Sequence, residues 1–75
     1  MEHQILQEVY SRLLKYDETL RYKIAAKNNR RLRTIDEWRK KNHPMLTHEK
    51  NLNIIRDHYK LPSDILLTEP IKNHN

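Results

Sequence analysis

The chain has 75 residues, no cysteine, no glycine and a formal net charge of +5 at pH 7. A chain of this length forms one domain with a small core, and without cysteine it has neither disulfides nor thiolate chemistry. It has no apolar run long enough to span a membrane, and its first residues lack the form of a signal peptide, so we expect a cytoplasmic protein.

The composition and the spacing of the apolar residues predict an all-α fold. Without glycine, tight β-hairpin turns are disfavoured, and the β-branched residues do not gather in alternating runs. Residues 4–16 have one apolar face at helical spacing, which predicts a first helix that packs into the core. The apolar positions of this face are Ile5, Leu6, Val9, Tyr10, Leu13 and Leu14.

A second helix is expected after residue 17. Asp17 is suited to cap its first turn, and Leu20 and Ile24 have the spacing of an inward face. The helix should end after about residue 27 at Asn28-Asn29, because asparagine tolerates the left-handed backbone that ends many helices.

Two further helices follow in the pattern. Leu32, Ile35 and Trp38 recur at helical spacing and predict a third helix that ends near residue 42. It stops there because the residue before Pro44 avoids helical geometry. Thr47 is suited to cap a fourth helix that runs to about residue 60.

The end of the chain is less apolar and less regular. A short helical turn is expected at residues 64–67, followed by a frayed polar tail at residues 70–75. The sequence therefore predicts one compact domain of four to five helices, covering residues 1–69.

The excess positive charge is concentrated in residues 21–41. This segment has nine of the fifteen Lys and Arg residues against only Asp36 and Glu37, a net charge of +7. Residues 1–20 carry −2, and residues 42–75 are balanced. A concentrated basic segment is typical of a protein that binds a polyanion, most often nucleic acid. The alternative is a solvated helix face.

Two short helices joined by a short turn, the second strongly basic, meet the needs of a helix-turn-helix DNA reader. The segment AAKNNRRLRTIDEW resembles the helix-turn-helix of the lambda-repressor/Cro-like family, in the form found in small regulators of phages and mobile elements. Ala25 stands at the family's small residue, Asn29 at its glycine, and Ile35 and Trp38 at its apolar anchors. Arg31 stands where the family often has a Ser or Thr cap.

The resemblance implies which residues contact DNA. Arg33 is suited to a bidentate contact with guanine, and an acid in the groove can accept from cytosine. The expected base-contacting residues are Arg31, Leu32, Arg33, Asp36, Glu37 and Lys40. The expected phosphate-contacting residues are Lys27, Arg30, Arg39 and Lys41, which set register without reading sequence. Asp36 and Glu37 have a second interpretation, as salt-bridge partners of nearby cations at helical spacing.

The function predicted from these residues is sequence-specific binding of double-stranded DNA by a repressor-type transcriptional regulator. A homodimer is one form in which it could bind. One alternative is a small protein-binding inhibitor or antirepressor that uses the same scaffold on an acidic protein partner. Another is an architectural protein that bends DNA.

Other chemistry has little support in the sequence. The five histidines do not form a metal-binding set, and no nucleophile stands with a base and an orienting group. We therefore expect no metal, no cofactor and no enzymatic activity.

Overall fold

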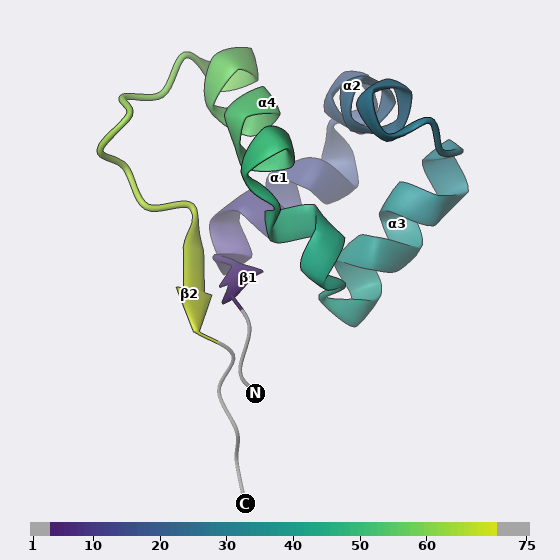
Figure 1. Cartoon of the computed structure of the whole chain (residues 1–75), viewed down its shortest axis with the longest axis horizontal. Coiled ribbons are helices and arrows are strands. Elements are labelled where there is room, and N and C mark those ends of the chain that lie inside the picture. The colour runs from purple at the N-terminus through teal and green to yellow at the C-terminus, as the bar shows by residue number, and fades with distance from the viewer. Residues whose placement is uncertain (1–3, 71–75) are drawn as a thin grey trace, which may run out of the picture.

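Four α-helices, one 3-10 helix and a two-stranded sheet make up the computed structural model, which describes residues 4–70 (Figure 1). In this part of the chain, no helix has the length and apolar character needed to cross a membrane. In chain order, the elements are β1 (Gln4–Leu6), α1 (Glu8–Tyr16), α2 (Glu18–Asn28), α3 (Leu32–Lys41), η1 (Pro44–Thr47), α4 (Glu49–Tyr59) and β2 (Thr68–Pro70).

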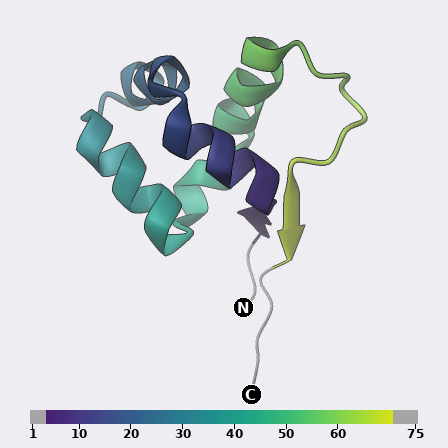
Figure 2. The same cartoon turned by 180° about the vertical axis from the view of Figure 1, so that it is seen from behind.

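The small sheet corrects the all-α prediction. Residues 4–6, expected to begin the first helix, form β1 instead, and β1 pairs antiparallel with β2 with Leu6 opposite Thr68. The backbone N–H of Gln7 extends the pairing by donating to the Leu67 carbonyl at 2.9 Å. The two strands lie side by side below the helices (Figures 1 and 2). This pairing joins the first and last described segments of the chain.

The final segment also differs from the prediction. Residues 64–67 form no helical turn, and the chain from α4 to β2 is a loop. Pro70, expected in the frayed tail, belongs to β2, and residues 71–75 of that tail lie outside the described residues.

The start of the fourth helix lies one residue later than predicted. His48, not Thr47, caps α4, and its Nδ1 accepts from the backbone N–H of Lys50 at 3.3 Å. Thr47 ends η1, and its hydroxyl lies 3.0 Å from the Gln4 carbonyl of β1. The Thr47 side chain thus connects η1 to the sheet rather than capping a helix.

Three helices end in the same way although the chain has no glycine. Asn29, Asn42 and Lys60, after α2, α3 and α4, have φ of 53°, 51° and 53°. After α2, the backbone N–H of Arg30 donates to the Ala25 carbonyl at 2.9 Å, the pairing of a Schellman motif, and α3 and α4 end with the same pairing. The turn at Asn29 confirms the prediction. The end of α3 lies where Pro44 predicted it, but the left-handed geometry of Asn42 was not predicted.

The core forms between the helices and the inner side of the sheet. Leu20 and Ile24 of α2 and Ile35 of α3 are fully buried, as predicted. The predicted inner face of α1 is only partly right: Leu14 is fully buried, whereas Val9 is 54% exposed. The buried face of α1 is therefore narrower than the sequence pattern suggested, since Val9 and Leu13 lie outside it.

A polar cluster joins the start of α2 to the end of α4. The Asp17 carboxylate caps α2 by accepting from Leu20 N–H at 3.1 Å, as predicted. It also accepts from the Tyr59 hydroxyl at 2.7 Å and lies 2.9 Å from Nε2 of His58. These hydrogen bonds, with that of Tyr59 foremost, lower the pKa of Asp17 to about 2. Burial and the Asp17 charge raise the pKa of Tyr59 to about 12.

A second polar cluster joins the other ends of the same two helices. Asn51 of α4 is fully buried, and its Nδ2 donates to the Met45 carbonyl of η1 at 2.7 Å. Its Oδ1 accepts from Nδ2 of Asn28, the last residue of α2, at 2.7 Å. Asn51 thus satisfies both halves of its amide and links three elements.

The Asp17 cluster predicts a specific acid sensitivity. The native pKa of about 2 lies below the ordinary value of 3.8, so the charged carboxylate stabilises the fold above that ordinary value. This contribution, about 1–2 kcal/mol after screening, is lost as the pH falls from about 4 to 2. Over this range the free energy of unfolding of the unaltered protein should fall towards that of Asp17→Asn, both measured by urea denaturation. A difference between the two proteins that stays constant from pH 5 to pH 2 would contradict the role of the charge.

The Asn51 cluster predicts a stability loss. Asn51→Ala should lower the free energy of unfolding by about 1–3 kcal/mol, because the partly buried Met45 carbonyl and Asn28 amide each lose a hydrogen bond. Asn53→Ala, on the exposed side of the same helix, is the matched control. Equal losses in the two variants would show that the buried network contributes nothing of its own.

Candidate nucleic-acid interface

The segment proposed to contact DNA is two helices and a short turn. α2 ends at Asn28, α3 begins at Leu32, and the residues between them form the left-handed turn at Asn29. α3 lies at the edge of the described structure, and no other helix or strand of residues 4–70 covers its outer side (Figures 1 and 2). The helix is thus held by the core on one side and open on the other.

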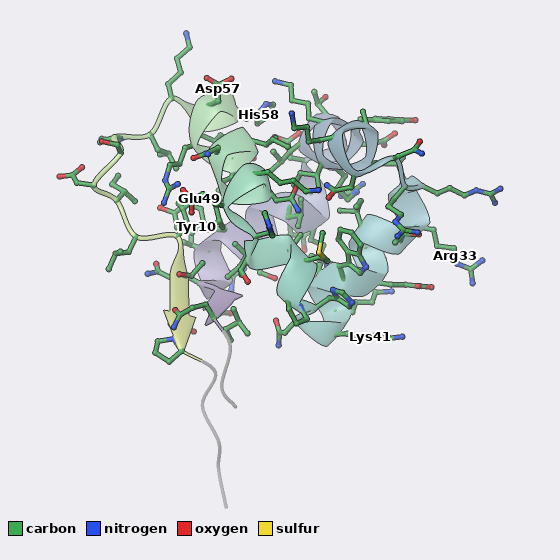
Figure 3. The ribbon with its side chains drawn as sticks, viewed as in Figure 1. Tyr10, Arg33, Lys41, Glu49, Asp57 and His58 are labelled. Atoms are coloured by element: carbon green, nitrogen blue, oxygen red, sulfur yellow. The ribbon has the colours of Figure 1, made fainter. Side chains whose placement is uncertain are left out.

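The two sides of α3 are sharply different. Ile35 is fully buried and Trp38 is 9% exposed, and the Trp38 ring stacks on His43 at 5.2 Å between centroids. On the opposite side, the Arg33 side chain is 90% exposed. Figure 3 shows Arg33 and Lys41 pointing away from the protein. The periodicity of the sequence therefore placed the inner and outer sides of this helix correctly.

Both acids of α3 form ion pairs with cations of the same helix. Nε of Arg33 lies 3.6 Å from Glu37, and Nζ of Lys40 lies 3.2 Å from Asp36. Asp36 also accepts from Arg39 at 3.1 Å, and this hydrogen bond is the main cause of its lowered pKa. The salt-bridge interpretation of the two acids is thus what the structure shows, and base contact by either remains a prediction.

Arg39 differs from the other residues predicted to contact phosphate. Its side chain is only 14% exposed and is held by Asp36. Reaching a phosphate would require Arg39 to leave this position, so the geometry disfavours that role. Leu32, predicted to touch a base, is half-buried and packs against the core, which makes it an additional anchor of α3.

The unpaired cations of residues 21–41 lie around the two ends of α3. Among the residues that the structure describes, Lys27, Arg30, Arg31 and Lys41 have exposed side chains with no hydrogen bond or ion pair. Three of them surround the α2–α3 turn, and Lys41 lies at the far end of α3. These positions bracket the outer side of α3 with unneutralised charge.

An open groove of about 500 Å³ lies beside α3. It runs between α3 and the corner where α1 meets α2, and its lining includes Arg21, Arg33, Asp36, Arg39 and Lys40. Cations outnumber acids along it, so the positive potential continues past the helix itself. In the range 4–70, no group of three or more possible metal-ligating side chains is found.

Two cations of the basic segment have structural partners that the sequence did not reveal. Nη1 of Arg21 donates to the Leu14 carbonyl at the end of α1 at 2.8 Å. Nζ of Lys23 lies 2.9 Å from Nδ1 of His58 in α4. Both partners are distant along the chain or belong to the backbone, so no local pattern indicates them.

Comparison with known proteins adds nothing to these observations: no family model, no curated protein and no solved structure matches the chain. The resemblance to the lambda-repressor/Cro-like family therefore stays a prediction that depends on the pattern from Ala25 to Trp38.

The start of α3 yields a stability prediction. Arg31 has the extended backbone of a capping residue, φ −85° and ψ 157°, but its side chain caps nothing. Arg31→Ser should therefore raise the free energy of unfolding by about 0.5–2 kcal/mol, measured by thermal or urea denaturation. Arg30→Ser removes the same charge one residue earlier and should give no such gain. Equal gains in both variants would attribute the effect to charge rather than to the cap.

Proposed function

We propose that this protein is a sequence-specific regulator of transcription that binds double-stranded DNA through α3. In this proposal α2 and α3 act as a helix-turn-helix of the lambda-repressor/Cro-like type, and the protein represses a promoter by occupying it. The observation that carries the proposal is the combination of an exposed α3 with unpaired cations at both of its ends.

The dimensions and charges of α3 support this use. A major groove of about 12 Å admits one α-helix, provided that no other element covers its outer side. The outer side of α3 meets this condition, and Arg33, whose side chain is 90% exposed, is of the type that reads guanine. Lys27, Arg30 and Lys41 are suited to phosphate contacts on either side.

A second candidate is an inhibitor or antirepressor that binds an acidic protein. The observation in its favour is the pair of acids on α3, which neutralise the two outward cations Arg33 and Lys40. This leaves the middle of the helix less positive than its two ends, which weakens its attraction to the dense charge of a phosphate backbone. The experiment below distinguishes the two functions.

The DNA proposal predicts steeply salt-dependent binding. Duplexes selected from a random pool should bind the protein, and the affinity should fall as salt rises because phosphate contacts release counterions. Lys41→Ala should weaken all duplexes alike and lower the salt slope by about 1. Arg33→Ala should cost about 1–3 kcal/mol on the selected sequence and relax its preference. Both are measured by fluorescence anisotropy over a salt series.

Arg12→Ala serves as the control for these variants. Arg12 is an exposed cation on α1, paired with Glu8 at 2.8 Å, and its loss should leave the duplex affinity unchanged. If the protein has no measurable affinity for any duplex at about 50 mM salt, the DNA proposal is wrong.

A further inference from the structure

We propose a second binding surface, the α2–α4 groove, that takes an acidic amphipathic helix from a partner protein. The groove consists of two adjoining hollows of about 510 and 500 Å³, which share Lys27, Ile54 and Asp57. It is lined by Lys23, Ala26, Lys27, Lys50, Ile54 and Asp57. This surface borders the proposed DNA interface at Lys27 but does not include the outer side of α3, and the proposal does not rest on DNA binding.

The two helices that form the groove run antiparallel. Lys23 of α2 bonds His58 near the end of α4, whereas Asn28 bonds Asn51 near its start. In Figure 3, Asp57 and His58 lie at the end of α4 beside α2. The groove therefore has Lys27 and Lys50 at one end and Lys23 and Asp57 at the other.

Charge is distributed unevenly along this groove. At the first end, Lys27 and Lys50 have no ion-pair partner among residues 4–70. At the second end, Asp57 offsets the charge of Lys23, which is also held by His58. Between them, Ala26 is exposed and Ile54 is half-buried, so the floor is apolar.

This arrangement specifies the chemistry of the occupant. An apolar side chain fits on Ala26 and Ile54, and a carboxylate one helical turn away meets Lys27 and Lys50. A helix carries such pairs on one face at a spacing of three or four residues. A phosphate backbone fits less well, because it has no apolar group for the floor.

A designed peptide tests the proposal directly. The probe is a synthetic helix of about four turns, with leucines along one face and glutamates beside them. It is titrated into the isotopically labelled full chain while the amide resonances are recorded. The expected result is a saturable shift of resonances from Lys27, Lys50 and Ile54, with those of Arg33 unmoved. The control peptide has lysine at every glutamate and should not bind.

Two variants place the peptide in the groove. Lys50→Glu should weaken binding roughly fivefold or more, the equivalent of about 1 kcal/mol for the reversal of a surface contact. Ala26→Gln should abolish binding by filling the floor, and it keeps a good helix former at an exposed position. Lys41→Glu, on α3, should leave the peptide affinity unchanged.

Several results would overturn the groove proposal and leave the DNA proposal standing. One is the absence of saturable binding at millimolar peptide, and another is equal binding of the lysine peptide. A third is a shift of the Lys50 and Ile54 resonances by duplex DNA, which would make the groove part of a nucleic-acid surface. If duplex affinity is absent but the acidic peptide binds, the DNA proposal alone fails.

Discussion

The structure depends on the way that α2 is held against α4 at both of its ends. At its start, the Asp17 carboxylate bonds both Tyr59 and His58, and at its end Asn28 bonds the buried Asn51. Each of these contacts joins residues at least 23 positions apart in the chain. Because hydrogen bonds between buried or half-buried polar groups have strict geometry, they fix the angle and register of α2 more tightly than apolar packing alone.

The position of α3 follows from that of α2. Only three residues separate the two helices, and the left-handed turn at Asn29 sets their angle. Leu32, Ile35 and Trp38 then attach α3 to the core from its first turn to its last. Lys60 shows how strongly the fold imposes such turns, because a lysine in left-handed geometry bears about 1 kcal/mol of strain. The sequence thus uses tertiary packing where other chains use glycine.

Local rules explain what the sequence predicted correctly. Periodicity placed α2, α3 and α4, the cap at Asp17 was recognisable, Asn29 marked the turn after α2, and Pro44 marked the end of α3. Each of these features depends on residues within one or two helical turns. The sheet was missed because β1 and β2 pair residues from nearly opposite ends of the chain, such as Gln4 with Pro70 and Leu6 with Thr68. Three-residue strands carry no alternation that a sequence pattern can show.

In the candidate site, too, features that depend on neighbouring residues were predictable, and features that depend on tertiary packing were not. The ion pairs of Asp36 and Glu37 follow helical spacing and were weighed as an alternative from the sequence alone. The burial of Arg39 was not foreseeable, because it depends on how closely α1 approaches α3. Lys50 lies outside the basic segment, and only the antiparallel packing of α2 on α4 brings it opposite Lys27.

In the proposed DNA complex, the ion pairs on α3 would affect how Arg33 contacts a base. An exposed pair such as Arg33 with Glu37 is worth only about 0–1 kcal/mol, so its rupture costs little when a better acceptor approaches. In the free protein, Glu37 limits the conformations of the long Arg33 side chain, which reduces the entropy that Arg33 loses on binding. The more buried pair of Arg39 with Asp36 stays closed and supports the helix. On α3, Arg39 therefore has a structural role, whereas Arg33 is available for contact with a partner.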